Sequence, residues 1–158
     1  MIRVERYHDI SCGHRVFGHE GKCQHLHGHN YRIRFVCEAI NEDEVAASFV
    51  APKTYPQRDG GLDALGRVID FGVIKSRLCA WVEDTWDHRM LLWSRDPLLG
   101  QLKEFDRMVV SVPFNPTAEN IARYLVLNVG PELLAGLGVR LVSVTVEETR
   151  KCSATFSL

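Results

Sequence analysis

The chain lacks the features that mark several classes of protein. It has no surplus of basic residues, because 19 Lys and Arg stand against 20 Asp and Glu, which gives a formal net charge of -1. The basic footprint of a nucleic-acid-binding protein is therefore absent. No stretch approaches the ~20 apolar residues of a membrane-spanning helix, and the first residues carry no long apolar run. We expect small molecules or further copies of the chain as partners, and a cytoplasmic location.

Cysteine is present, but not in the patterns of a disulfide framework or a structural zinc site. No C-x-x-C pair occurs, the spacing is irregular, and the number of cysteines is odd. We therefore expect reduced thiols and no disulfide bond. The five cysteines are Cys12, Cys23, Cys37, Cys79 and Cys152.

The length of 158 residues predicts a single domain, 1–158. Apolar residues alternate with polar ones in four segments and recur at helical spacing in two others, and this pattern predicts the element order ββααββ. A short additional strand is expected at 108–113. The predicted strands are 2–12, 29–40, 139–148 and 152–158, and the predicted helices are 70–86 and a segment that follows the N-cap Thr117.

Residues 41–66 interrupt this pattern. The segment begins with a run of acidic residues and continues with Pro52, Pro56 and three glycines. Such a composition is typical of a long loop or an elaborated turn.

The segment Cys23–His29 carries the most informative side chains. Side chains two residues apart on a strand point to the same face, so His27 and His29 lie side by side. If the first strand continues to His14 and the chain turns back over residues 15–26, an antiparallel neighbour brings His14 to that face. Three neutral imidazoles leave a tetrahedral Zn²⁺ one open position, which is the pattern of a catalytic zinc site.

Other interpretations of these residues stay open on spacing alone. A closed Cys2His2 structural zinc site would use Cys12 or Cys23 as a further ligand. The lack of a C-x-x-C pair favours a separate role for Cys23. Single histidines are more often core or surface residues, and we interpret His8, His19 and His25 in this way.

A carboxylate ends the apolar row of the penultimate strand. Val142, Val144 and Val146 share one face by the two-residue period, and Glu148 continues that face. An unpaired buried carboxylate is costly, so Glu148 needs either a ligand with N–H donors or water at the strand end. Glu147 points the other way and can stay solvated.

Asp87 and His88 follow the first predicted helix. A thiol becomes a useful base when an imidazole lies nearby, and a carboxylate can orient that imidazole. Cys23, His88 and Asp87 are therefore a candidate proton-transfer set. On spacing alone, a helix-end cap with a surface imidazole is the alternative.

Six short motifs follow one another along nearly the whole chain. They are His14, Cys23-x-x-x-His27-Gly28-His29, Ile69-Asp70-Phe71, Asp87-His88, Pro116-Thr117-Ala118-Glu119-Asn120 and Glu148-Thr149. Each motif is weak alone, but the six in this order are specific. The chain resembles the 6-pyruvoyl-tetrahydropterin and 6-carboxy-tetrahydropterin synthase family.

This resemblance implies an α+β tunnelling fold, or T-fold. In such a fold a four-stranded antiparallel sheet with two helices joins its copies into a trimeric β-barrel, and two trimers stack into a homohexamer. The resemblance also implies the site. The zinc ligands would be His14, His27 and His29, the proton-transfer residues Cys23, Asp87 and His88, and the pterin anchor Glu148.

The three residues between Cys23 and His27 resemble the bacterial carboxy branch of the family. The implied reaction is the zinc-dependent conversion of 7,8-dihydroneopterin triphosphate to 6-carboxy-5,6,7,8-tetrahydropterin, with release of acetaldehyde and triphosphate, in queuosine-type deazapurine synthesis. Two alternatives are a pyruvoyl-forming lyase on the same scaffold and a non-catalytic zinc- or pterin-binding module. The presence of Cys23, Asp87 and His88 together argues against the non-catalytic module.

Overall fold

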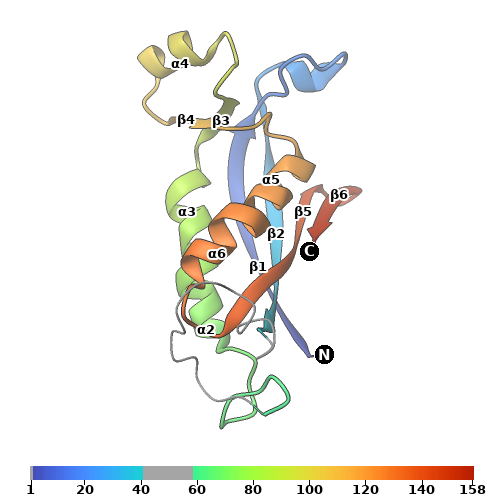
Figure 1. The fold of residues 1–158 in the computed structure, drawn as a ribbon. Helices are drawn as coiled ribbons and strands as arrows, with labels where there is room; N and C mark the ends of the chain where they lie inside the picture. Colours follow the sequence, from blue (N-terminus) through green and yellow to red (C-terminus); the bar gives the residue numbers. More distant parts are fainter. Residues whose placement is uncertain (1, 41–58) are drawn as a thin grey trace.

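A computed structural model describes residues 2–40 and 59–158 of the chain. One curved sheet of six strands has the order β4-β3-β1-β2-β5-β6 (Figure 1). Its larger part is an antiparallel run of four strands, as the sequence predicts. These strands are β1 (Arg3–His14), β2 (His27–Ala39), β5 (Val139–Thr149) and β6 (Cys152–Ser157).

Two short parallel strands extend this four-stranded antiparallel sheet. β3 (Met90–Trp93) runs parallel to the end of β1, and β4 (Val109–Val112) runs parallel to β3. The short helix α4 (Leu99–Phe105) connects these two strands. The strand expected at 108–113 is present as β4, whereas the pattern does not predict β3 or α4. β3 is four apolar residues long, so it lacks the alternation that distinguishes a strand from a buried helical turn.

The first helix lies where the sequence predicts it. It comprises α2 (Phe71–Ile74), a π-helical segment (Lys75–Cys79) and α3 (Ala80–Trp86). The Asp70 carboxylate caps its start by accepting a hydrogen bond from the Gly72 amide at 2.7 Å.

The second helix begins after Thr117, whose hydroxyl accepts a hydrogen bond from the Asn120 amide at 3.3 Å, so the predicted N-cap is confirmed. The helix comprises α5 (Ala118–Tyr124), a π-helical segment (Leu125–Val129) and α6 (Gly130–Leu133). A single five-residue π-helical segment therefore interrupts each of the two helices, a departure from regular geometry that hydrophobic spacing does not reveal.

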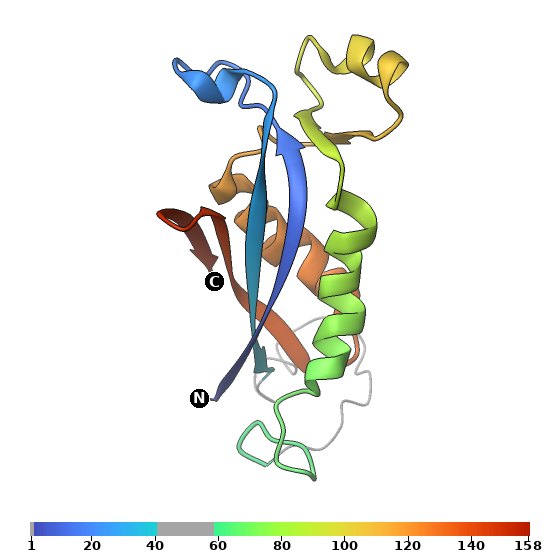
Figure 2. The same cartoon turned by 180° about the vertical axis from the view of Figure 1, so that it is seen from behind.

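The helices cover one face of the sheet, and the view from behind shows β1 and β2 uncovered (Figures 1 and 2). The second helix approaches β5 closely, because a Cβ on Gly130 would lie only 2.7 Å from the Cβ of Leu141. Alternate residues of the strands fill the core between the helices and the sheet. Among them are Ile10, Ile33, Phe35, Val144 and Val146, each at most 5% exposed.

The open face of the sheet carries ion pairs. Arg32 donates two hydrogen bonds of 2.8 Å to the Asp9 carboxylate, and Arg34 donates to Glu147 at 2.7 Å. A shift of one residue in strand pairing would move these charges into the core. The alternation of charged and apolar residues therefore specifies the register of the strands.

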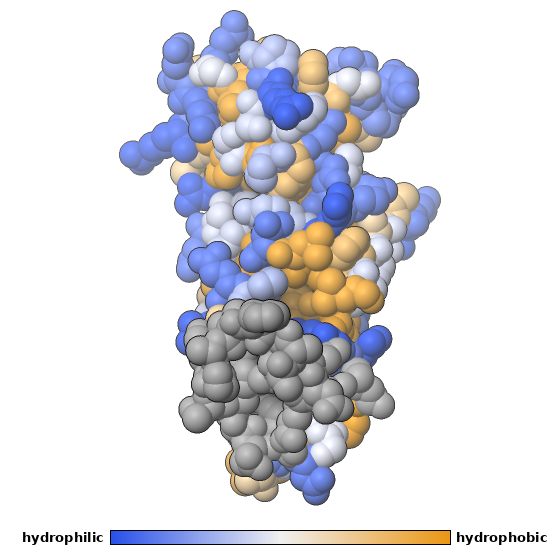
Figure 3. Space-filling view, in the orientation of Figure 1, coloured by the Kyte–Doolittle hydropathy of each residue, from blue (hydrophilic) through white to orange (hydrophobic). Residues whose placement is uncertain are grey.

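Figure 3 shows the surface from the helical side. Hydrophilic side chains form most of its outline, and an apolar patch lies near its centre, above the residues drawn in grey. None of the described helices is both long enough and apolar enough to cross a lipid bilayer.

The loop expected at 41–66 lies largely outside the described residues, which leave out 41–58. In its described part, an isolated antiparallel bridge joins Asp59 to Leu62. Three glycines of this part have positive φ angles, which agrees with a turn-rich connection: Gly60, Gly61 and Gly66.

Glu38 joins three strands at the end of the sheet remote from the histidines. It stands directly opposite Arg3 on β1 and Arg140 on β5, and its side chain is 2% exposed. Its carboxylate accepts hydrogen bonds from Arg3 Nε at 2.9 Å and from Arg140 Nη2 at 2.8 Å. Burial raises the pKa of Glu38, but the hydrogen bonds from the two guanidinium groups outweigh it, so the pKa lies below its ordinary value.

We expect Glu38→Gln to lower the free energy of unfolding by about 1–3 kcal/mol at pH 7, because two arginines lose their charged acceptor. A carboxylate with a depressed pKa stabilises the fold above its unfolded pKa, and this contribution disappears as the pH falls through the folded pKa. In chemical denaturation, the difference between wild type and variant should therefore shrink as the pH is lowered from 7 towards about 3.

Asp9→Asn is the matched control, since it removes a carboxylate from an exposed pair with Arg32. It should cost less than about 1 kcal/mol. A cost of Glu38→Gln that stays constant with pH would show that the charge of Glu38 does not stabilise the sheet.

Candidate active site

Strand register brings three histidines together at one end of the sheet. β1 extends to His14, and His14 stands directly opposite His27 on β2. His29 lies two residues further along the same face. Each imidazole offers one ligand atom, and the three atoms lie within 4.8 Å of one another. This arrangement suits one cation held by three imidazoles.

Hydrogen bonds orient two of these rings. His14 Nδ1 lies 2.7 Å from the Pro116 carbonyl oxygen, and His27 Nδ1 lies 2.8 Å from the His25 carbonyl oxygen. A carbonyl oxygen only accepts, so each Nδ1 carries the proton and each Nε2 keeps its lone pair. The buried Nε2 of His14 has no hydrogen-bond partner. Carbonyl groups orient metal-binding histidines in the same way, so the donor set fits a metal.

Burial favours the neutral, metal-binding form of two of these imidazoles, those of His14 and His29. It lowers the pKa of His14 to about 4, and the neighbouring imidazoles add a smaller effect in the same direction. Burial also lowers the pKa of His29, although the nearby carboxylate of Glu148 opposes this shift. At neutral pH the lone pairs are therefore available without loss of a proton.

Two glycines lie behind the histidines, on the other face of the sheet. Gly13 and Gly28 stand opposite each other on β1 and β2. A Cβ on Gly28 would lie 3.0 Å from the carbonyl oxygen of Cys12, and a Cβ on Gly13 would lie 2.5 Å from Cε of Met90. The glycine of the His-Gly-His segment thus permits the close approach of β1 and β2 at this point.

Cys12 is not placed to complete a closed zinc site. Its Sγ lies 3.3 Å from the carbonyl oxygen of Arg89 and 3.5 Å from that of Gly13. Burial raises the pKa of Cys12 to about 12, and Asp87 adds to the effect, so the thiol keeps its proton. The three-histidine cluster contains no cysteine. Among the described residues, nothing favours a Cys2His2 site here.

Cys23 lies in the connection between β1 and β2, within the short 3₁₀ helix Lys22–Gln24. Together with His14 and Glu148 it lines a cavity of about 290 Å³. The amide of Val16 donates a hydrogen bond to the Cys23 carbonyl at 2.8 Å, which closes the base of the connection. The connection therefore carries the Cys23 thiol to the histidine end of the sheet.

Asn115 fastens this connection to the start of α5. Its side-chain oxygen accepts a hydrogen bond from the Phe17 amide at 3.0 Å, and its side-chain nitrogen donates to the Phe17 carbonyl at 2.8 Å. The carbonyl of Asn115 accepts a hydrogen bond from the Asn120 side chain at 2.9 Å. The next residue, Pro116, supplies the carbonyl that orients His14. One turn thus holds both the Cys23 connection and a candidate metal ligand, and no local pattern in the sequence marks Asn115 for this role.

The two glutamates of β5 lie on opposite faces. Glu148 lines the Cys23 cavity, and its Oε1 lies 3.9 Å from Nε2 of His14. Glu147 lies on the open face, where it accepts the hydrogen bond from Arg34. The alternation expected from the sequence holds from Val144 to Glu147, but a register shift opposite Val36 and Cys37 places Leu141, and not Val142, in the core cluster with Val144 and Val146. A second irregularity lies between Glu147 and Thr149, and Glu148 also borders the hollow of the open face.

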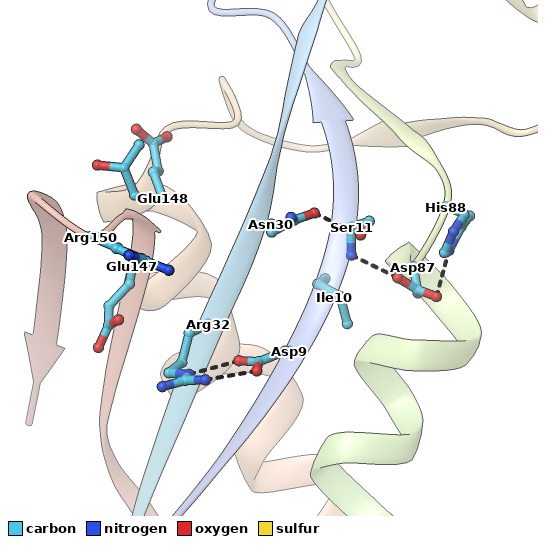
Figure 4. Close-up of a pocket in the computed structure, with 11 residues that line it drawn as sticks. Asp9, Ile10, Ser11, Asn30, Arg32, Asp87, His88, Glu147, Glu148 and Arg150 are labelled. Carbon is cyan, nitrogen blue, oxygen red and sulfur yellow. Dashed lines mark hydrogen bonds and ion pairs between the residues drawn. The ribbon is translucent and has the colours of Figure 1, made fainter.

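Asp87 and His88 form an oriented pair at the edge of β1 (Figure 4). The Asp87 carboxylate accepts a hydrogen bond from the Ser11 amide at 2.8 Å and lies 2.7 Å from Nδ1 of His88. Burial raises the pKa of Asp87, but the Ser11 amide and His88 outweigh it and hold the pKa below its ordinary value. His88 has a φ of 54°, and among the described residues no other non-glycine has a positive φ. Such backbone strain is frequent at functional sites.

The predicted proton-transfer residues do not meet within one chain. Asp87 and His88 line a hollow of about 830 Å³ on the open face, whereas Cys23 lines the smaller cavity near the histidines. Figure 4 shows His88 and Glu148 on opposite sides of the β1–β2 pair. The side chain of His88 is 78% exposed, so it is free to approach a group from outside the chain.

Three further residues lie close to the histidines. His19, which the sequence presents as an ordinary surface residue, and Cys152 both line the Cys23 cavity. The Tyr31 ring lies next to His29, with a distance of 5.4 Å between ring centroids. The two-residue period that aligns the histidines extends to Tyr31. His19 and Cys152 reach the cavity through loop and hairpin geometry, for which the sequence holds no signal.

The chain is similar in sequence to known proteins over nearly its whole length. The profile of the family described as 6-pyruvoyl tetrahydropterin synthase matches residues 3–158. A 6-carboxy-5,6,7,8-tetrahydropterin synthase of Rickettsia bellii is 34% identical over 154 residues, which cover 96% of this chain and 97% of the relative.

Two solved structures share the fold. A protein of Wolinella succinogenes described as uncharacterized has a TM-score of 0.75 at 22% identity, with 99% of this chain and 97% of that chain covered. The 6-pyruvoyl tetrahydropterin synthase of Caenorhabditis elegans has a TM-score of 0.56 at 24% identity, with 99% and 95% covered. The profile match over residues 3–158 and the 34% identity to a full-length relative show that the chain belongs to the 6-pyruvoyl tetrahydropterin synthase family, with its T-fold.

Proposed function

We propose that the protein is a zinc-dependent 6-carboxy-5,6,7,8-tetrahydropterin synthase. It would convert 7,8-dihydroneopterin triphosphate to 6-carboxy-5,6,7,8-tetrahydropterin and release acetaldehyde and triphosphate. The observation that carries this proposal is the single cavity lined by His14, Cys23 and Glu148, beside the three-histidine cluster. The names of the Rickettsia relatives support the substrate class.

His14, His27 and His29 would hold the zinc ion. The unpartnered, buried Nε2 of His14 and the lowered pKa values of His14 and His29 fit this role. When bound, Zn²⁺ supplies Lewis-acid polarisation of the hydroxyl oxygens on the substrate side chain. The three imidazoles come from one sheet face, so the side facing the Cys23 cavity is left for substrate.

Glu148 would fix the pterin ring. A carboxylate accepts two parallel hydrogen bonds, and a pterin presents an amide N–H beside an exocyclic amino group. Charge-assisted hydrogen bonds of this kind orient a ligand and strengthen its binding. Glu147 cannot share the task, because Arg34 holds it on the other face.

Proton transfer would be the task of Cys23, His88 and Asp87. The thiol of Cys23 lines the substrate cavity and would accept and return a proton at the substrate side chain. Asp87 holds the imidazole of His88 in one orientation. Since these groups line different hollows of one chain, we propose that His88 of one subunit serves the Cys23 cavity of another.

The edges of the sheet support such an assembly. In the described part of the chain, no strand pairs with the outer edge of β6, and between Arg3 and Ile10 no strand pairs with the edge of β1 that faces away from β2. Open edges of this length invite pairing with further strands, and closure of a barrel removes them. We propose that β6 and β1 of neighbouring copies pair in a homotrimer or in a homohexamer of two stacked trimers.

Two other functions use the same residues. A pyruvoyl-forming lyase would eliminate triphosphate on the same zinc and pterin contacts, so only the product distinguishes it. A non-catalytic module would bind zinc or pterin without turnover. We place the reaction in queuosine-type deazapurine synthesis in the cytoplasm, where the five cysteines, all free thiols in the structure, would stay reduced.

The metal assignment predicts which variants lose zinc. His27→Ala and His29→Ala should each lose most of their zinc on dialysis, because two imidazoles hold the ion far less tightly than three. Cys23→Ala should keep its zinc and lose turnover, because Cys23 is assigned to proton transfer. Metal analysis by mass spectrometry measures the content, and His8→Ala, on the same strand as His14, is the control. Full zinc content in both histidine variants would exclude the assignment.

The substrate assignment predicts one product and one anchor. Incubation of the zinc-loaded protein with 7,8-dihydroneopterin triphosphate should give 6-carboxytetrahydropterin and acetaldehyde by mass spectrometry. Glu148→Gln places an amide donor opposite the ligand donors, so we expect pterin binding at least about tenfold weaker, with zinc retained.

Glu147→Gln is the matched control and should bind pterin almost as well as wild type, because its side chain lies on the open face. A 6-pyruvoyl product would support the alternative lyase, and pterin binding without any product would support the non-catalytic module. Equal losses in the two glutamate variants would refute the anchor.

The assembly predicts complementation between inactive variants. Cys23→Ala and His88→Ala should each be inactive alone. Mixed oligomers, formed by co-expression, should regain part of the wild-type kcat, since some sites combine an intact Cys23 with an intact His88. Light scattering should show a trimer or a hexamer at micromolar concentration. A monomer, or mixed oligomers without activity, would refute the shared site.

A further inference from the structure

The hydroxyl of Tyr31 is a buried polar group without a partner. The residue is 2% exposed, and its oxygen makes no hydrogen bond within the described structure. A buried hydroxyl that lacks a partner destabilises the fold, so a phenylalanine would stabilise it better at this position. Buried polar groups of this kind need an explanation, and a role in ligand binding is one.

The position of Tyr31 on β2 places it beside the candidate zinc site. It follows His29 by two residues and therefore shares the face of the three histidines. Its ring packs edge-on against His14 and His29, with centroid distances of 5.8 Å and 5.4 Å. The ring therefore packs against the histidine cluster, whereas the hydroxyl lacks a hydrogen-bond partner.

Strand register points the hydroxyl towards Glu148. Arg32 stands opposite Glu147 in the terminal pair of the antiparallel β2–β5 register, and Tyr31, just before Arg32, and Glu148, just after Glu147, lie directly beyond that pair. Oε1 of Glu148 lies 3.9 Å from Nε2 of His14, and the Tyr31 ring packs against the ring of the same histidine at a centroid distance of 5.8 Å, so both side chains are neighbours of His14. Glu148 is therefore the acceptor that faces the hydroxyl.

The Glu148 carboxylate lies close to the first of two buried atoms that lack a hydrogen-bond partner, Nε2 of His14 and the Tyr31 hydroxyl oxygen. Its Oε1 is 3.9 Å from the buried Nε2 of His14, too far for a hydrogen bond, and the Tyr31 hydroxyl lies on the same side of the sheet. If a metal occupies the histidine cluster, the lone pair of His14 is used, and the hydroxyl remains as a donor for the carboxylate. A carboxylate held by one donor on its protein side presents its remaining lone pairs to a ligand in one orientation.

We propose that Tyr31 is a positioning residue for the pterin anchor. Its hydroxyl donates a hydrogen bond to Glu148 in the ligand-bound protein and so fixes the carboxylate that receives the pterin N–H groups. This inference rests on the proposed function of Glu148. It also explains why a polar group is kept in the core at the cost of stability: the hydroxyl is satisfied only when the site is occupied.

Tyr31→Phe separates this role from a structural one. The variant keeps the ring contacts with His14 and His29 and removes only the hydroxyl. We expect the melting temperature of the zinc-loaded, ligand-free protein to stay equal or rise, because an unsatisfied group is removed. We expect the Kd for 7,8-dihydroneopterin, measured by titration calorimetry, to rise about five- to tenfold. KM should rise by a similar factor, kcat should change less, and the zinc content should not change.

Tyr124→Phe is the control, since the Tyr124 ring packs against Phe114 and Trp86 in the core away from the cavity. It should leave the Kd unchanged. The Glu148→Gln background provides the decisive comparison. If Tyr31 acts through Glu148, adding Tyr31→Phe to Glu148→Gln should weaken pterin binding by less than twofold further.

Every other outcome of these measurements would contradict either the inference or the proposed function. An unchanged Kd in Tyr31→Phe overturns the inference, and so does a full additional loss in the Glu148→Gln background, which would make Tyr31 an independent contact. A melting temperature well below that of Tyr124→Phe would mean that the hydroxyl is bonded inside the fold, which also overturns it. If the wild-type protein itself does not bind 7,8-dihydroneopterin, the proposed function fails, and the anchor role of both residues fails with it.

Discussion

The pairing of β1 with β2 is the constraint on which the rest of the structure depends. It places His14 opposite His27 and Gly13 opposite Gly28, and it extends without a register shift from these residues to the far end, where Arg3 stands opposite Glu38. A slip of one residue would move one strand's histidines to the open face and its charged residues into the core. The charged pair at one end of the β1–β2 ladder and the glycine pair at the other end therefore favour the same register.

Because of this register, the two faces of the sheet carry side chains of different chemistry. The helix-covered face is apolar along most of its length and ends in the histidine cluster, so the candidate metal site is a continuation of the core. The open face is polar and borders the Asp87–His88 pair. A reaction that needs groups from both faces cannot be completed within one copy of this sheet, whereas neighbouring copies in a ring can bring an open face to a histidine end.

Unsatisfied buried polar atoms mark the same region. Nε2 of His14 and the hydroxyl of Tyr31 both lie at the histidine end of the sheet without a hydrogen-bond partner. At the opposite end, the Glu38 carboxylate is buried as deeply but is fully paired with two arginines. The Glu38 carboxylate thus has its partners within the fold, whereas Nε2 of His14 and the Tyr31 hydroxyl have none there. A metal and a ligand are the partners that the proposed function would supply.

The sequence by itself determined the four long strands, although not the register shifts within β5, together with the start of the second helix at Thr117, the alignment of His27 with His29 and the separation of Glu147 from Glu148. These follow from local periods and capping, which are properties of neighbouring residues. The tertiary structure alone decided that β3 and α4 exist, that Asn115 holds the Cys23 connection, and that Asp87 with His88 lies apart from Cys23. Such facts depend on contacts between segments remote in the chain. No local period encodes these contacts, because packing and loop closure select them.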